Sequence, residues 1–597
     1  MANILGLLLL AIPSVKIAKW FEGTIFQKTS AGLLSFVLLN PFVVFIIHSL
    51  IKTPLTTNLF LCASVITALI TLLLKKSKPT KENKIKISLI VLTFITVIPL
   101  LISYLPASKP IIGGDTQHYL LSSGYIIKNK LLRTNFDRSI VHIFPAILYS
   151  LTSISIENGI KIMVSLTFIS FSLSLFKIFN KSTKNHLAST LLLFPVLLTE
   201  PITDLSFFII ALFIAYSVLI KIVDILSKKK LNNKNLIFTI FLWICLFNLH
   251  IQIAISSIII IPIVFLINKR QFKINKKLLI VLPLSILIFS GIGLKRYWKN
   301  GVIKANISTF GSKIFPSLIK KSESVYSTSW LAKDLPSLLN FPYHRLAYKK
   351  HYSIVIFLLF MLGMGGVFGE HKKNLRIKTY AAIAIILFLV TQQSYLGLDL
   401  LSGRFVLLLS PFIILFAYIG LFRLLKLSSR QKKKKLAPIS AFIILLVFIP
   451  KTYKNLKELR STVPTIEQAE YGTIKNISKF VGQNTPIFTI IPTQNWAQGL
   501  NPHHTFIRIK TSVMCSNDPE IKRTTQRTHW DINTAFFKDT NQKKSVEILS
   551  KIAKTQDYYI VLDIKSYWCI NPDVVSPPEY KIISEDDGYY LLKHKAS

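Results

Sequence analysis

Long apolar blocks separated by short polar segments occupy the chain as far as residue 450. A helix needs about 20 apolar residues to cross the ~30 Å hydrocarbon core of a membrane. Fourteen blocks approach or reach that length, so the pattern predicts a polytopic α-helical membrane protein with about 12–14 transmembrane helices. The candidate spans lie near residues 2–19, 31–51, 57–74, 86–106, 159–178, 187–199, 202–225, 235–249, 250–268, 278–294, 353–369, 379–396, 405–425 and 437–450.

Positive charge gathers between the apolar blocks. The chain has 72 Lys+Arg and 27 Asp+Glu, a formal net charge of +45. Basic runs at residues 75–86, 228–234, 269–277, 372–378 and 426–435 form the pattern of cytoplasmic loops under the positive-inside rule. Because no basic domain stands apart from the spans, the charge argues against a nucleic-acid partner. The 51% hydrophobic content excludes intrinsic disorder.

The basic runs also predict a topology. When each of them is placed in the cytoplasm, the alternation of sides continues to the C-terminus without contradiction. The predicted units are N-terminal spans at 1–106, an outer catalytic loop with surface helices at 107–158, and a transmembrane core at 159–450 that includes an outer loop at 295–352. A soluble domain at 451–597 follows, on the outer face of a cell membrane.

The tail after residue 451 alternates short apolar runs with polar turns, which predicts a small α/β domain. Residues 486–492 and 558–563 suit buried strands, and residues 466–480 and 545–554 suit helices. Residues 580–593 suit a hairpin with an Asp-Asp-Gly turn.

The outer loop at 107–158 carries the first candidate site residue. Asp115 stands in the segment PIIGGDTQHY, directly after a predicted span. An ionisable group at the membrane edge is a functional candidate, although the same Asp could simply cap the helix that follows. His118 could line the same site but completes no recognisable metal motif. An amphipathic stretch from residue 115 and an apolar stretch at 142–154 predict two helices on the membrane surface.

Two further predicted outer turns carry polar side chains. Glu200 and Asp204 are four residues apart, so they could share a helix face, hold a divalent cation or cap the next span. His250 stands in a polar cluster at another outer turn. A single histidine at such a place is more often a satisfied interfacial residue than a ligand.

Cationic residues mark two more outer boundaries. Lys295 and Arg296 follow one predicted span, and Arg404 precedes another. Such side chains grip phosphate, and they also anchor helices at the interface. Cys515 and Cys569 both lie in the tail, where an oxidising compartment would allow a disulfide between them.

The order of these features resembles the GT-C membrane glycosyltransferases, which include protein O-mannosyltransferases and the aminoarabinose transferases of lipid A. Asp115 and Tyr119, followed by the sequence HIFPAILY, resemble the first outer loop of that family. The sequence LLTEPITD ending at Asp204 resembles its second acidic site, and SGRF around Arg404 resembles its late Arg-aromatic segment. Thr116 stands where many members have a second acid, and the Trp-Trp-Asp block of oligosaccharyltransferase catalytic subunits is absent.

The resemblance implies transfer of a sugar from a polyprenyl-phosphate carrier to a glycan, lipid or protein acceptor outside the cytoplasm. Asp115 would be the general base, while Glu200 or Asp204 would orient the acceptor or hold a cation. The cationic residues named above would bind the donor phosphate, with Tyr119 and the two histidines as further binding residues. No cofactor is certain; Mg²⁺ or Mn²⁺ held by Asp115 and Asp204 stays open.

Other classes of function also stay open. A flippase of lipid-linked glycans predicts charges inside the bundle and inverted repeats with broken helices. A lipid-linked glycan polymerase or ligase would share the cationic outer loop without needing the Asp115 segment. A non-catalytic envelope protein predicts no converging carboxylates. The lack of GxSxG, HExxH, Walker and dinucleotide fingerprints leaves soluble nucleotide chemistry without support.

Overall fold

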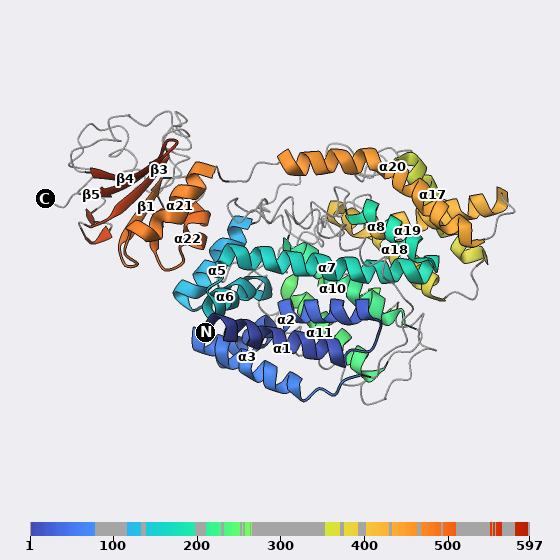
Figure 1. The fold of residues 1–597 in the computed structure, drawn as a ribbon, viewed down its shortest axis with the longest axis horizontal. Coiled ribbons are helices and arrows are strands. Elements are labelled where there is room, and N and C mark those ends of the chain that lie inside the picture. The colour runs from blue at the N-terminus through green and yellow to red at the C-terminus, as the bar shows by residue number, and fades with distance from the viewer. Residues whose placement is uncertain are drawn as a thin grey trace, which may run out of the picture.

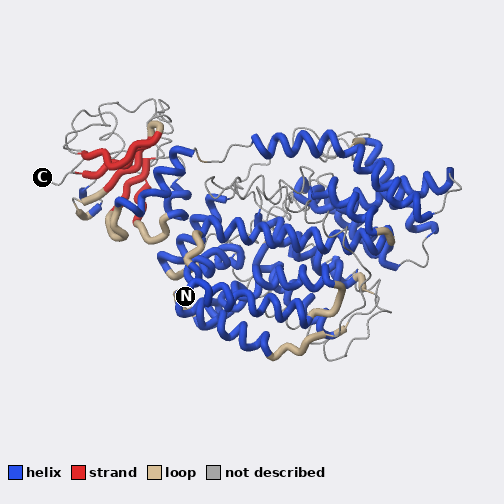
Figure 2. The backbone as a smooth tube through the Cα atoms, in the orientation of Figure 1, coloured by secondary structure: helices blue, strands red, loops and turns tan. Residues whose placement is uncertain are grey.

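The computed structural model describes two parts of the chain, a bundle of helices and a smaller C-terminal domain with a sheet (Figures 1 and 2). The predicted class, a helical membrane protein with a C-terminal α/β domain, is confirmed for these residues. The described residues are 2–77, 116–132, 139–197, 210–228, 232–250, 353–370, 375–391, 402–428, 433–461, 468–490, 494–508, 557–563 and 580–594, with isolated residues at 253–264, 466 and 550–555.

The helices of the bundle follow the predicted apolar blocks closely. Predicted spans near 86–106 and 278–294 lie outside the described residues, as does most of the one near 250–268. The bundle helices are α1 (Ala2–Trp20), α2 (Ile25–Ile51), α3 (Thr57–Leu72), α5 (Thr116–Asn129), α6 (Ser139–Thr152), α7 (Ile156–Thr183), α8 (His186–Leu197), α10 (Ile210–Leu226), α11 (Asn233–Leu249), α17 (Ile354–Glu370), α18 (Leu375–Thr391), α19 (Ser402–Ser428) and α20 (Lys433–Ser461).

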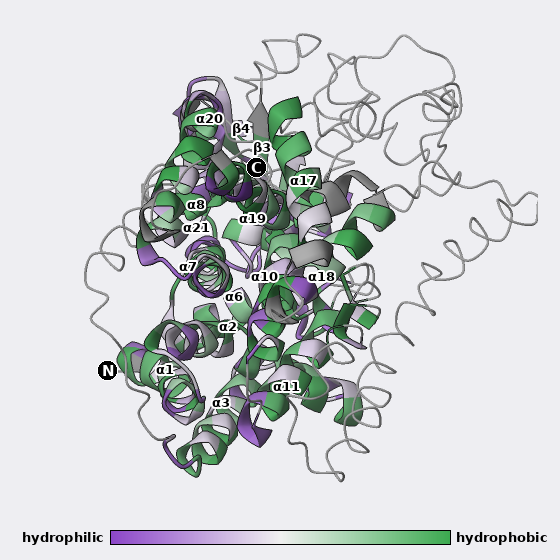
Figure 3. Cartoon of the chain, turned by 90° about the vertical axis from the view of Figure 1, so that its right-hand side faces the viewer, coloured by the Kyte–Doolittle hydropathy of each residue, from purple (hydrophilic) through white to green (hydrophobic). Residues whose placement is uncertain are grey.

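Length and surface chemistry make this a multi-pass membrane protein. Among the described residues, five helices are long and apolar enough to cross a membrane, namely α1, α2, α7, α19 and α20. Large apolar side chains such as Leu8, Leu69, Leu358 and Phe442 are exposed on the outside of the bundle, where Figure 3 shows green, hydrophobic helices. An apolar surface of this extent is stable only against a partner or lipid.

Different segments of the chain meet at the two ends of the bundle. At one end, the Ser77 backbone N–H donates to the Lys19 carbonyl at 3.0 Å, which joins the start of the first basic run to the end of α1. At the other end, the Leu55 N–H donates to the Lys130 carbonyl at 2.7 Å, beside the C-terminal domain (Figure 1). We call these the Lys-rich end and the domain end. The described parts of residues 107–158 and of the tail lie at the domain end.

A buried charge cluster joins three helices at the Lys-rich end. The Asp224 carboxylate of α10 accepts hydrogen bonds from Gln27 Nε2 at 2.9 Å and from Lys181 Nζ at 2.7 Å. Lys221 Nζ lies 3.8 Å from the same carboxylate and donates to the Gln27 carbonyl at 2.8 Å. The side chains of Asp224 and Lys221 have no exposed surface, so the cluster ties α2, α7 and α10 together by charges removed from water.

The second helix of the outer loop differs from the expectation that it lies on the membrane surface. Every residue of α6 from Ser139 to Leu148 is buried, and α6 packs against α1, α2, α5 and α7. Even its polar residues Ser139 and His142 are buried, so the neighbouring helices cover both its apolar and its polar side.

The C-terminal domain contains a five-stranded sheet in the order β2-β1-β3-β5-β4. The strands β1 (Pro486–Ile490), β2 (Thr505–Arg508) and β3 (Tyr559–Asp563) are parallel, whereas β4 (Tyr580–Asp586) and β5 (Tyr589–His594) form an antiparallel hairpin.

The local predictions for this domain are largely confirmed. The helix α21 (Gln468–Phe480) and the strands β1 and β3 lie where the pattern placed them. The hairpin turns at Asp587 and Gly588, which have φ of 46° and 86°; positive φ at both central residues is the geometry that favours Asp-Gly in two-residue hairpins. The predicted helix at 545–554 lies mostly outside the described residues, and the pattern missed α22 (Gln494–Leu500) and β2.

Candidate functional site

Most of the predicted site residues lie outside the part of the chain that the structure describes. These are Asp115, Glu200, Asp204, Lys295 and Arg296, together with the candidate disulfide residues Cys515 and Cys569. Arg404 lies in the first turn of α19, where only the backbone is described. The structure therefore gives information on the site only through the described helices that follow or contain these residues.

Tyr119 connects the start of α5 to the start of α10. Its side chain is buried, and its hydroxyl oxygen accepts a hydrogen bond from the Ala211 backbone N–H at 3.1 Å. Ala211 is the second described residue of α10. The contact joins the helix that directly follows Asp115 to the helix that follows the Glu200–Asp204 segment.

The same helix α10 also contacts the first turns of α19. The Tyr216 hydroxyl donates to the Leu408 carbonyl, and Leu408 lies one helical turn, about 6 Å along the axis, from Arg404. Ala211 and Tyr216 are separated by about 7.5 Å along α10. Two helices, α5 and α19, thus contact α10 within its described first turns.

The two described histidines occupy different settings. His118 is partly buried in the first turn of α5, next to Tyr119. His250 is buried at the end of α11, where its backbone N–H donates to the Leu246 carbonyl at 3.0 Å and its carbonyl accepts from the Ala254 N–H. The backbone of His250 is thus hydrogen-bonded to residues on both sides of it in the chain. Among the described residues, no cluster of three or more His, Cys, Asp or Glu side chains is suited to hold a metal ion.

His142, the first residue of the HIFPAILY segment, packs beside Tyr119. The His142 side chain of α6 is buried, and its ring centroid lies 5.4 Å from that of Tyr119. Ser123 of α5 donates to the His142 carbonyl at 3.0 Å. These side chains therefore contribute to the packing of α5 against α6. The sequence indicated this packing only by placing both helices in one outer loop.

The C-terminal domain packs directly on α5 through two glycines. A Cβ on Gly124 would lie 2.8 Å from the Gln498 carbonyl oxygen, and a Cβ on Gly499 would lie 2.4 Å from the Leu120 Cβ. The missing side chains let α5 and α22 approach to backbone contact. Lys128 extends the contact, because its Nζ donates to the His504 carbonyl at 2.8 Å. The domain therefore covers the helix that begins next to Asp115.

A second contact fastens the domain to α7. The Tyr471 hydroxyl of α21 donates to Glu157 Oε2 at 2.6 Å, and Lys161 Nζ lies 3.4 Å from Glu157 Oε1. Burial, and then the neighbouring Glu157 charge, raise the pKa of Tyr471 above its ordinary 10.0. The phenol therefore keeps its proton and acts as the donor. Sequence reasoning missed this pair because its members are 314 residues apart.

Tyr471→Phe is expected to loosen the domain from the bundle. Hydrogen bonds to charged groups contribute roughly 1.5–3 kcal/mol, and the variant leaves a buried carboxylate with one donor fewer. We expect a lower melting temperature and faster release of the domain in limited proteolysis. Tyr590→Phe is the matched control, because Tyr590 donates to Glu585 at 2.8 Å on the exposed surface. Equal behaviour of the two variants would contradict a fastening role for Tyr471.

Comparison with known proteins finds similarity to solved structures of two enzymes. No family model and no curated protein matches the chain. Among solved structures, the chain is similar to the apo oligosaccharyltransferase of Archaeoglobus fulgidus, with 11% identity and a TM-score of 0.46 over 81% of this chain and 71% of that one. It is also similar to ArnT of Cupriavidus metallidurans bound to undecaprenyl phosphate, with 10% identity and a TM-score of 0.47 over 86% and 98% of the two chains.

The apo form of ArnT gives the same TM-score of 0.47 at 11% identity, over 85% of this chain and 97% of that one. Both enzymes are GT-C membrane glycosyltransferases, the superfamily that the order of motifs in this sequence resembles. At such identities, and with TM-scores below 0.5, the likeness by itself assigns neither substrate nor site residues to this chain.

Proposed function

We propose that this protein is a membrane glycosyltransferase that moves a sugar from a polyprenyl-phosphate-linked donor to an acceptor outside the cytoplasm. The observation that supports the proposal is the contact of two helices, α5 and α19, with α10. Tyr119 ties the helix after Asp115 to the start of α10, and Tyr216 ties α10 to the first turns of α19. The helix that follows Asp115 and the helix that contains Arg404 are therefore both in contact with α10, the helix that comes after Asp204 in the chain.

The proposed chemistry needs one base and one cationic grip. Asp115 accepts the proton of the acceptor hydroxyl, and the hydroxyl oxygen then attacks the anomeric carbon of the donor sugar. The bond from that carbon to the phosphate oxygen breaks, and the polyprenyl phosphate leaves with the electron pair. Arg404, with Lys295 and Arg296, stabilises the charge on the departing phosphate.

The remaining predicted residues have supporting roles in this proposal. Glu200 or Asp204 orients the acceptor, and Asp115 with Asp204 offers the carboxylate oxygens that Mg²⁺ or Mn²⁺ prefers. His118 and His250 belong to the same end of the bundle as the start of α10. We place that end on the outer face of the cell membrane, because the basic runs mark the opposite end as cytoplasmic.

The test is a transfer assay with the full-length protein in proteoliposomes. A panel of polyprenyl-phosphate-linked radiolabelled monosaccharides is offered with cell-envelope glycan, lipid and protein fractions as acceptors. We expect label to move to an acceptor from a lipid-linked donor and not from the matching nucleotide sugar. Label that crosses the bilayer still attached to its lipid would identify a flippase instead, and transfer from nucleotide sugars alone would overturn the donor class.

A further inference from the structure

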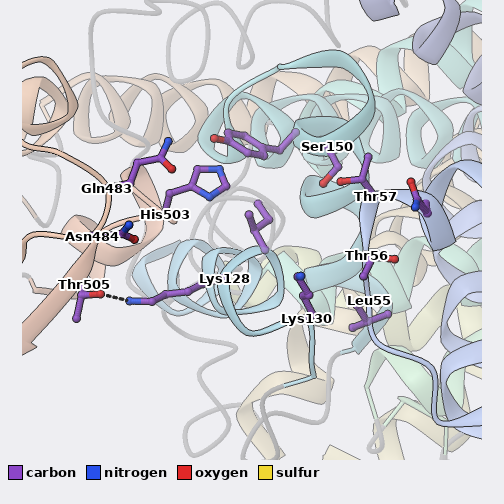
Figure 4. A pocket seen from close by; sticks show the side chains of 13 residues that line it. Leu55, Thr56, Thr57, Lys128, Lys130, Ser150, Gln483, Asn484, His503 and Thr505 are labelled. Atoms are coloured by element: carbon purple, nitrogen blue, oxygen red, sulfur yellow. Dashed lines mark hydrogen bonds between the residues drawn. The ribbon is translucent and has the colours of Figure 1, made fainter.

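A polar cleft lies between the C-terminal domain and the bundle, away from the helix starts described above. It has a volume of about 760 Å³, within the range of about 300–1,000 Å³ typical of small-molecule sites. Figure 4 shows Gln483, Asn484 and His503 of the domain on one side and Ser150 with the residues that begin α3 on the other. Lys130 points into the space between them (Figure 4).

The walls of the cleft are joined to one another. Lys128 Nζ of α5 donates to Thr505 Oγ1 at 3.0 Å, so the bundle and the first residue of β2 are bonded across the floor of the cleft. The ring centroids of Tyr149 and His503 lie 5.8 Å apart, with the ring planes tilted by 44°, so these side chains connect the two walls at one point. The Lys130 carbonyl accepts the Leu55 N–H at 2.7 Å. The cleft is therefore built by specific contacts between three segments.

The lining favours a polyhydroxylated ligand. Most of the side chains carry hydroxyl or amide groups, which can both donate to and accept from sugar hydroxyls. Tyr149 adds an aromatic face on which the apolar side of a sugar ring can rest. Burial, and then the neighbouring His504, lower the pKa of His503, so its imidazole is neutral near pH 7 and has an acceptor nitrogen for a hydroxyl.

The charge of the cleft favours an anionic ligand. Lys128 and Lys130 both line it, and none of the described lining residues is acidic. The helix α3 begins at the cleft with Thr56 as its N-cap, so the positive end of a 16-residue helix dipole adds to the two cations.

We propose that this cleft binds an anionic oligosaccharide, the part of the acceptor glycan that lies away from the transferred sugar. The assignment of the ligand as an acceptor rests on the proposed function. The helix α5 links the two places: Thr116 follows Asp115 directly, and Lys128 lies near the other end of the helix. Fourteen residues make this helix about 20 Å long, a distance that a glycan of several sugar units spans.

The experiment measures binding directly, with no donor present. The full-length protein is held in nanodiscs of uncharged-headgroup phosphatidylcholine and titrated with trigalacturonate, with neutral maltotriose and with inorganic phosphate. We expect trigalacturonate to bind more tightly than maltotriose and phosphate to compete only weakly. Equal affinity for the two trisaccharides, or full displacement by phosphate at equal concentration, would overturn a glycan site selective for anions.

The key variant is Lys130→Gln, with Lys184→Gln as its matched control. Both lysines are exposed and have nearly the same backbone geometry, with φ of 56° and 54°. Lys184, however, is the C-cap of α7, three residues after Lys181 of the Asp224 cluster at the Lys-rich end. Loss of one charge-assisted contact is expected to weaken trigalacturonate binding about five- to tenfold in Lys130→Gln only. Equal affinities of the two variants would also overturn the proposal.

The binding and transfer experiments test the glycan site and the proposed function independently. Trigalacturonate binding without any sugar transfer would leave the cleft as a glycan site and reject the proposed function. Transfer without trigalacturonate binding would keep the proposed function and reject the cleft as a glycan site.

A double variant, Gln483→Ala with Asn484→Ala, removes two amides from an exposed turn. It is expected to lower the affinity for both trisaccharides. Unchanged affinity for both would show that the sugar does not lie between the two walls.

Discussion

Asp115→Asn is expected to reduce sugar transfer by about 10²–10⁴-fold, the usual contribution of a general base. The amide has nearly the same size as the carboxylate but cannot accept the acceptor proton. Steady-state transfer from the lipid-linked donor, measured in proteoliposomes at saturating acceptor, checks this expectation. Asp115→Glu keeps the carboxylate and should retain more activity than the amide variant.

Controls separate a chemical loss from a folding loss. The melting temperature of Asp115→Asn should equal that of the wild type, and its trigalacturonate affinity should be unchanged because the cleft lies at the other end of α5. Asp557→Asn changes an exposed Asp of the C-terminal domain and should leave transfer intact. Normal turnover by a folded Asp115→Asn protein would reject the role of this residue as the base.

Asp224→Asn is expected to destabilise the protein by about 3–5 kcal/mol, the typical result of removing one partner from a buried ion pair. The variant leaves the Lys181 and Lys221 ammonium groups beside a neutral amide, and Lys221 has no exposed surface to bring its charge to water. Thermal unfolding in detergent, followed by loss of the monodisperse peak in size-exclusion chromatography, measures the effect.

The matched control for Asp224→Asn is again Asp557→Asn. Asp557 pairs with Lys593 at 3.5 Å, but their side chains are 57% and 40% exposed, and exposed pairs contribute only about 0–1 kcal/mol. The double variant Asp224→Asn/Lys221→Met removes one surplus charge and should recover part of the lost stability. Equal melting of Asp224→Asn and Asp557→Asn would show that the cluster is not a buried ion-pair network.

Local patterns were sufficient to predict most elements of the fold. The apolar block near 159–178 became α7, and the Asp-Asp-Gly turn became a hairpin with two positive φ angles. Both outcomes depend on interactions between residues close in the chain, or on the need of a long apolar segment for lipid. The helix α22 was missed because it has only seven residues, too few for a clear hydrophobic period.

The candidate site was predictable only as a set of residue types at the edges of spans. That Tyr119 holds the start of α10 could not be read from the chain, because its partner is a backbone N–H 92 residues away. The same holds for Tyr471 and Glu157, whose pairing fastens the C-terminal domain to α7. The roles of Asp115, Glu200, Asp204 and Arg404 stay predictions that the transfer assay tests.

The sequence by itself determined that this is a helical membrane protein with a small α/β domain after the last apolar helix. Hydropathy and charge decide these features, because the bilayer acts on each segment separately. The tertiary structure alone decided that α6 is buried, that Asp224 gathers lysines from two helices, and that the domain forms a polar cleft with α3, α5 and α6. These features depend on packing between distant segments, where one contact is specified by the shapes and charges of both partners.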